Sequence, residues 1–104
     1  MLTLDLIPQS VRAIFDVARR RFYLTVTWTP SCASHAIEAH KIYAGLSSGS
    51  YSEIIRVPWS GEARAVIDLP SIGPWFVVVT TIPKRMRESY FSHEVSRLAN
   101  VRAD

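Results

Sequence analysis

Apolar and polar residues alternate along much of the chain. The clearest stretch is RFYLTVTWTP, residues 21–30, in which Phe22, Leu24, Val26 and Trp28 occupy every second position. Threonine and tyrosine fill the positions between them. A period of two built from β-branched and aromatic residues predicts a half-buried β-strand. We therefore expect Leu24, Val26 and Trp28 to face a hydrophobic core.

Further stretches show the same features: short length, β-branched or aromatic residues, and a boundary of proline, glycine or small polar residues. They are IEAHKIYAG (37–45), SEIIRVPW (52–59), ARAVIDLP (63–70), PWFVVVTTI (74–82) and SYFSHEVSRLA (89–99). VRAIFDV (11–17) predicts either a seventh strand or one turn of helix, because Val11 and Phe15 are four residues apart. Ile42, Val77 and Val79 complete the predicted core.

Turn signals recur every eight to twelve residues, and no helix-length amphipathic stretch separates the strands. This spacing is typical of an all-β sandwich or barrel rather than of a parallel α/β sheet. The length of 104 residues suits one domain.

Charge, cysteine content and hydropathy limit the partners and the cellular compartment that we expect for this chain. The formal net charge is only +3, which permits an acidic partner without requiring one. Cys32 is the single cysteine, so no internal disulfide can form. The first ten residues lack the basic start and apolar stretch of a signal peptide, and no apolar run approaches the length of a membrane helix. We expect synthesis in a cytoplasm and no membrane association.

Four motifs in sequence order are similar to those of a fibronectin type III domain, especially of the bacterial and phage-borne kind. They are LTVTWTP (24–30), HKIYAGLSSGSYS (40–52), LPSIGPWFVVVTT (69–81) and ESYFSHEVS (88–96). The resemblance implies a seven-stranded immunoglobulin-like (fibronectin type III) β-sandwich over residues 8–98. Residues 1–7 then form an N-terminal arm and residues 99–104 a C-terminal tail.

Two positions depart from the pattern of that family. Trp75 stands where the family has a tyrosine whose hydroxyl bonds back to the preceding loop. We expect the indole to fill the volume with its N–H directed elsewhere. His40 replaces a second tyrosine, and we expect a half-buried imidazole there.

The residue types of hydrolytic and metal chemistry are present but not arranged for it. No Gly-x-Ser-x-Gly elbow occurs, and the SSGS sequence after Leu46 is better interpreted as a flexible loop. His35, His40 and His93 lack metal-ligand spacing. We therefore predict a protein that is not an enzyme and that has neither a metal nor a cofactor.

Basic residues cluster at two turns. Arg19 to Arg21 lie between the first two predicted strands, and Lys84, Arg85 and Arg87 lie near the last one. In a seven-stranded sandwich these turns lie at opposite ends. Each cluster is either a solvated turn or a contact for an acidic protein surface. No aromatic residues are interleaved with the arginines, so specific nucleic-acid binding is not expected.

Trp59 and the N-terminal arm are the remaining candidate contacts. Trp59 is either an exposed interface anchor or a side chain folded over the edge of the sandwich. Leu2, Leu4 and Leu6 alternate with polar residues. They would be an aggregation hazard if left uncovered. The arm either extends its own sheet or adds a strand to a neighbouring subunit.

The resemblance implies a function in contacts rather than in catalysis. Small free-standing modules of this kind resemble accessory proteins of tailed phage virions, which decorate a capsid or form part of a head–tail junction or tail. The expected partners are capsid, portal or tail subunits, with multiple copies per particle, after synthesis in the host cytoplasm. A glycan- or cell-surface-binding module using Tyr23, Tyr43 and Trp59 is the alternative, and a cytoplasmic adaptor is a third.

Overall fold

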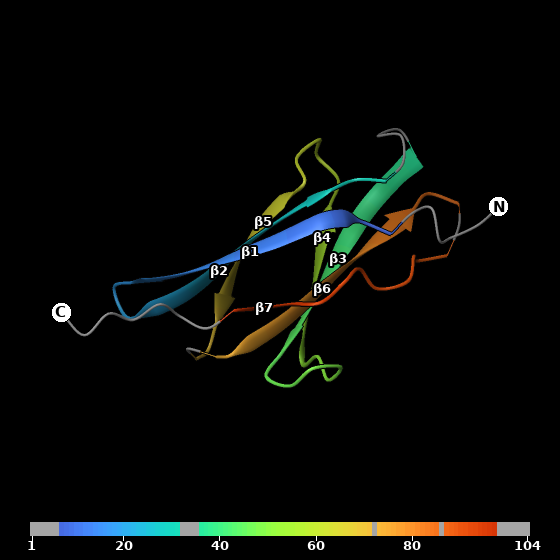
Figure 1. The fold of residues 1–104 in the computed structure, drawn as a ribbon. Coiled ribbons are helices and arrows are strands. Elements are labelled where there is room, and N and C mark those ends of the chain that lie inside the picture. Colours follow the sequence, from blue (N-terminus) through green and yellow to red (C-terminus); the bar gives the residue numbers. More distant parts are fainter. Residues whose placement is uncertain (1–6, 32–35, 72, 86, 98–104) are drawn as a thin grey trace.

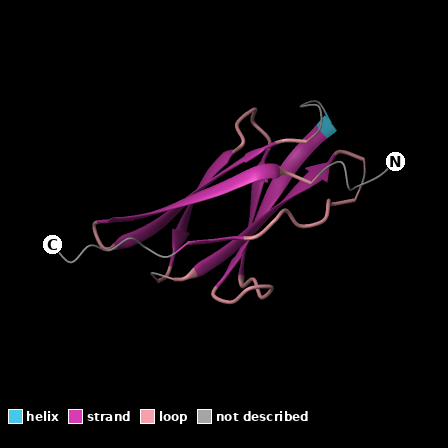
Figure 2. Ribbon diagram, in the orientation of Figure 1, coloured by secondary structure: helices cyan, strands magenta, loops and turns pink. Residues whose placement is uncertain are grey.

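Seven strands make up most of the structure, a computed structural model that describes residues 7–31, 36–71, 73–85 and 87–97. In chain order they are β1 (Gln9–Ala18), β2 (Arg21–Thr29), β3 (Ile37–Gly45), β4 (Glu53–Pro58), β5 (Arg64–Leu69), β6 (Trp75–Pro83) and β7 (Val95–Arg97) (Figure 1). The all-β prediction is therefore confirmed, and strands dominate the ribbon in Figure 2.

The strands form two antiparallel sheets. One has three strands in the order β1-β2-β5, and the other has four in the order β4-β3-β6-β7. β3 is an inner strand of the second sheet, so Tyr43 lies on a strand in the middle of that sheet. The two sheets enclose one hydrophobic cluster to which both contribute.

The core lies between the sheets and follows the period of two. Every residue predicted for it is at most 5% exposed: Leu24, Val26, Trp28, Ile42, Val77 and Val79. Burial of one face of each sheet also explains the sequence pattern, since neighbouring residues of a strand point to opposite faces.

The ambiguous segment 11–17 lies in a strand, and the helical alternative is wrong. β1 pairs with β2 from Ala18 opposite Arg21 back toward the N-terminus. The two-residue turn between them places Arg19 at φ 51° and Arg20 at φ 68°. The backbone groups of β1 that face β2 are hydrogen-bonded to it. This pairing stabilises the strand and overrides the weak helical spacing of Val11 and Phe15.

The predicted strand 89–99 is wrong for most of its described length. Only Val95–Arg97 is a strand, and residues 88–94 run beside β6 without regular pairing. Residues 98 and 99 lie outside the described residues. Two serine hydroxyls take the place of main-chain acceptors here, as the next subsection describes.

The side chain of Trp75 bonds back to the loop that precedes β6. Its indole Nε1–H donates to the carbonyl of Ser71, at 3.0 Å, in the loop preceding β6. The ring is 1% exposed. The prediction that this N–H would point elsewhere is wrong, because the larger indole reaches a carbonyl only four residues upstream.

The expectation of a half-buried His40 is also wrong, since the residue is 0% exposed. Its ring lies 4.9 Å from that of Trp28 and 5.3 Å from that of Trp59. Among the described residues, neither ring nitrogen has a hydrogen-bond partner. Burial lowers the pKa of His40 from 6.5 to about 4, so the imidazole is a neutral aromatic part of the interior at neutral pH.

Candidate functional site

The outer face of the four-stranded sheet carries a cluster of aromatic and acidic side chains. Lys41 and Tyr43 project outward from β3, because Ile42 between them faces the core. Tyr43 is paired with Ile54 of β4 on one side and Val78 of β6 on the other. This row defines the centre of the face.

Segment 88–94 covers the β6 side of this face, and two serines attach it there. Ser89 Oγ accepts a hydrogen bond from the backbone N–H of Thr81, and Ser92 Oγ accepts one from Val79, each at 2.9 Å. The backbone N–H groups of the same serines donate to the carbonyls of Thr81 and Val79, at 2.9 and 3.0 Å. Each serine therefore makes both bonds that a strand residue would make.

These bonds direct the intervening aromatic residues outward. Both serines are buried, at 6% exposure, whereas Tyr90 and Phe91 between them are 63% and 50% exposed. Each serine hydroxyl also donates to the carbonyl of the next residue, which fixes its orientation. The spacing Ser-x-x-Ser thus presents two large rings on a fixed main chain.

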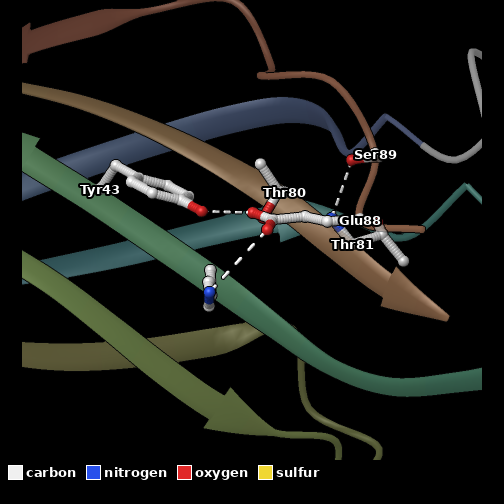
Figure 3. Close-up of polar contacts among 6 residues, drawn as sticks. Tyr43, Thr80, Thr81, Glu88 and Ser89 are labelled. Carbon is white, nitrogen blue, oxygen red and sulfur yellow. Dashed lines mark hydrogen bonds and ion pairs between the residues drawn. The ribbon is translucent and has the colours of Figure 1, made fainter. Parts of the chain in front are cut away.

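Glu88 connects this segment to β3 and β6 (Figure 3). Its Oε2 accepts hydrogen bonds from the Tyr43 hydroxyl and, at 2.6 Å, from Thr80 Oγ1. Its Oε1 lies 3.8 Å from Lys41 Nζ. Burial, followed by the bond to Glu88, raises the pKa of Tyr43 to about 12.

Glu94 makes an equivalent connection to the loop between β3 and β4. Its carboxylate accepts bonds from Ser48 Oγ at 2.6 Å, from the Gly49 N–H at 3.2 Å, and from the Tyr51 hydroxyl. The bonds from Ser48 and Tyr51 lower the pKa of Glu94. Burial and the bond to Glu94 raise the pKa of Tyr51 to about 12.

Gly45 lets the loop fold back onto the end of β3. A Cβ at this position would lie 1.9 Å from the Ser50 carbonyl oxygen, a distance that no side chain tolerates. Glycine is thus required for the close approach of the two main chains. This approach brings Tyr51 next to Tyr43, with ring centroids 6.3 Å apart.

Three aromatic rings pack together between the two carboxylates. Phe91 lies 5.0 Å from Tyr43 and 5.5 Å from Tyr51, with interplanar angles of 51° and 84°. Such inclined contacts are the favourable ones for aromatic pairs. Phe91 and Ile54, the latter 56% exposed, give the face an apolar surface. We call the residues Tyr43, Tyr51, Ile54 and Phe91 the aromatic face.

The side chains suggested for glycan binding do not gather at this site. Tyr23 lies on the three-stranded sheet, and Trp59 packs on the buried His40. Trp59 is half-buried, and its backbone N–H donates to the Glu38 carbonyl at 3.0 Å. Of the three suggested residues, only Tyr43 belongs to the aromatic face.

The other predicted contacts lie elsewhere or outside the described residues. Lys84, Arg85 and Arg87 are exposed beyond the end of β6, at the opposite end of the molecule from the β1–β2 turn (Figure 1). Leu2, Leu4 and Leu6 fall outside the described residues.

Sequence reasoning missed the residues that build the aromatic face besides Tyr43. The usable signal was ESYFSHE, in which two serines three residues apart are flanked by Glu88 and Glu94. Read as a strand, this segment places Ser89 and Phe91 on one face. The serine bonds instead bury Ser89 and leave Phe91 half-exposed.

The hydroxyls and carboxylates of this face bond to one another. Within the described ranges, no group of three or more His, Cys, Asp or Glu is placed to hold a metal ion. No helix in the described part of the chain has the length and apolar character to cross a membrane. No model of a known protein family matches the chain, and no curated protein matches it.

Proposed function

We propose that this chain is a non-enzymatic structural or accessory protein of a tailed phage virion, with a fibronectin type III-like fold. It binds other virion subunits, in capsid decoration or at the head–tail junction or tail. The phage assignment comes from the sequence resemblance over residues 8–98. The side-chain geometry supports one part of the proposal, namely that the chain acts by binding other proteins through its surface and not by catalysis.

Two structural features support the immunoglobulin-like assignment. Seven antiparallel strands are divided between a three- and a four-stranded sheet around one core. The Trp75 side chain bonds back to Ser71 at the place where that architecture uses a tyrosine.

The aromatic face is the observation that carries the contact function. Phe91 and Ile54 are half or more exposed, although Ile54 lies in β4 and Phe91 lies between two serines that bond to β6. Glu88 and Glu94 have their oxygens engaged by neighbouring side chains and main chain, so they shape the face instead of acting on a substrate. Rigid, exposed aromatic residues on a fixed scaffold are typical anchors of protein interfaces.

The glycan-binding alternative is less well supported. Stacking on a sugar ring requires an open, flat aromatic surface. The rings of Tyr43, Tyr51 and Phe91 are inclined to one another by 51° to 84°. A glycan array probed with the purified protein would reverse this preference if it gave specific hits that Phe91→Ser abolished.

The virion assignment is tested by mass spectrometry of purified particles of the encoding phage. The proposal requires the protein in stoichiometric amounts in those particles. A genome in which no capsid, portal or tail gene lies beside the gene for this chain would argue against the proposal. Absence from particles that contain every other structural protein would refute it.

The role of the aromatic face is tested by incorporation of variants into particles. Phe91→Ser combined with Ile54→Thr should leave the fold intact, because both side chains are exposed, and should reduce incorporation. Val17→Thr is the matched control, since it removes a side chain of similar exposure, 46%, from the other sheet. Equal incorporation of both variants would exclude the aromatic face as the contact.

The basic residues after β6 are a second, separable contact. Reversing Lys84, Arg85 and Arg87 to glutamate should weaken incorporation more at low salt than at high salt, because exposed charges act mainly through screened, long-range attraction. Incorporation that is indifferent to both charge and salt would leave this loop as a solvated turn.

A further inference from the structure

The outer face of the three-stranded sheet carries charges in an ordered pattern. Side chains that project outward from β1, β2 and β5 lie in rows across the strands, defined by the pairing register. One row begins and ends with arginine, Arg12 and Arg64, on either side of Thr27. Two rows further along, Asp16 and Asp68 flank Tyr23. The first of these rows is therefore basic and the second acidic.

An apolar row separates the two charged rows. Thr25 is paired with Ile14 on one side and Val66 on the other. Ile14 is 62% exposed and Val66 is 54% exposed. Adjacent outward rows are about 7 Å apart, so the basic and acidic rows are about 14 Å apart. This exceeds the screening length of about 8 Å at physiological salt, so the two rows do not neutralise each other.

These charges are available for a partner. The four charged side chains of the two rows are all exposed. The ion pairs found among the described residues, Lys41–Glu88 and Arg56–Glu38, both lie on the other sheet. Asp68 has a cationic neighbour on the face, Arg21, which lies one row beyond the acidic row.

We propose that this face binds a second copy of the same chain around a two-fold axis that runs along the row Ile14–Thr25–Val66. Rotation about that axis reverses the strand direction but keeps each strand in its lateral position. Arg12 then faces the partner's Asp16, and Arg64 faces the partner's Asp68. Ile14 and Val66 meet their own copies on the axis, so a face with one basic row and one acidic row becomes self-complementary.

The charge pattern also excludes the other two-fold arrangement. An axis along the strands would keep the rows in place and exchange β1 with β5. Arg12 would then face the partner's Arg64, and Asp16 the partner's Asp68, which is repulsive. Around the proposed axis, Arg21 lies opposite the partner's Thr29, so it meets no like charge.

The area of the face indicates the expected affinity of the dimer. Three strands spaced by about 4.8 Å and about eight residues long present a flat area of roughly 400 Å² a side. This is about half of the usual contribution of one partner to a stable interface. We therefore expect a reversible dimer with a dissociation constant of roughly micromolar or weaker, which salt weakens further.

Sedimentation velocity of the full chain tests this over a concentration series up to about 1 mM. The expected result is a shift from monomer to dimer that moves to higher concentration as salt is added. A variant with the control charge reversals Lys84→Glu and Arg85→Glu should dimerise equally, because these residues follow β6 of the four-stranded sheet and stand outside the charged rows. A chain that stays monomeric throughout the series would overturn the proposal.

Two double variants test the geometry. Arg12→Asp with Arg64→Asp makes the face acidic at both ends, and Asp16→Arg with Asp68→Arg makes it basic at both ends. Each variant alone should dimerise at least about tenfold more weakly than the unaltered chain. An equimolar mixture of the two should form a heterodimer, because every facing pair is then opposite in charge.

The mixture distinguishes disruption of the dimer interface from unfolding of the variants. Circular dichroism should show the same strand signal for the unaltered chain and for both variants, since all four substitutions are at exposed positions. Dimers that form equally well in each variant alone, or a mixture that remains monomeric, would overturn the proposal. The inference concerns only the three-stranded sheet and does not depend on the virion assignment.

Discussion

His40 should make the protein lose stability in mild acid, and replacing it with phenylalanine should remove that loss. The imidazole is fully buried between Trp28 and Trp59, and burial lowers its pKa from 6.5 to about 4. As the pH falls, the unfolded chain binds this proton before the folded protein does. Stability is therefore complete above pH 6.5, declines between pH 6.5 and 4, and levels off below pH 4.

The size of the effect follows from the two pKa values. The gap between 6.5 and about 4 corresponds to a maximum loss of about 3 kcal/mol, since each pH unit is worth about 1.4 kcal/mol. At pH 5 the loss from His40 alone is about 2 kcal/mol. That is a large share of the roughly 5–15 kcal/mol by which a domain of this size is stable.

Urea unfolding monitored by tryptophan fluorescence at pH 8 and pH 5 measures this loss. In His40→Phe the difference between the two pH values should shrink by about 2 kcal/mol relative to the unaltered chain. His93→Phe is the matched control, because it removes an exposed imidazole, and it should keep the full difference. The same fall in His40→Phe as in the unaltered chain would refute the reasoning, as would an NMR titration that places the pKa of His40 near 6.5.

Three further predictions concern the turn, the corner and the arm. Arg19→Asn with Arg20→Gly should stabilise the protein by about 1 kcal/mol in urea unfolding, because both arginines have positive φ in a two-residue hairpin turn that Asn-Gly adopts readily; a loss of stability would show that the arginine side chains contribute there. Trp75→Phe should cost about 2 kcal/mol, since it removes both ring volume and the bond to the Ser71 carbonyl, and a thermal midpoint unchanged from the parent would contradict this. Deleting residues 1–7 should leave the unfolding free energy nearly unchanged while preventing incorporation into particles, whereas unfolding of the truncated domain would assign the arm to its own sheet.

Much of the fold could be predicted from local pattern. Alternation from Phe22 to Trp28 defines β2 and its buried face, and the proline and glycine boundaries define most other strands to within a few residues. The period of two identifies β2 because one face of its sheet lies in the core, so buried and less buried residues alternate along the strand. Segment 11–17 remained ambiguous because short apolar spacing fits either element, and only pairing with β2 decides it.

The candidate site could be predicted only in part. Tyr43 lies in the predicted strand 37–45, next to the predicted core residue Ile42, but Tyr51 and Phe91 reach it from a loop and from an irregular segment. Their approach depends on the close contact at Gly45 and on serine hydroxyls that replace strand pairing. Neither feature has a periodic signature, because both are contacts between residues far apart in sequence.

The sequence by itself determined the all-β class and the buried face of β2, since these follow from the alternation of side chains along an extended chain. Tertiary structure decided which side chains meet across strands. It turned His40 into a buried neutral ring, joined the indole of Trp75 to the Ser71 carbonyl, and set Arg12 and Arg64 in one row with Asp16 and Asp68 in another. The physical reason is that burial and charge pattern depend on the register between strands, which distant main-chain hydrogen bonds establish and no single stretch of residues contains.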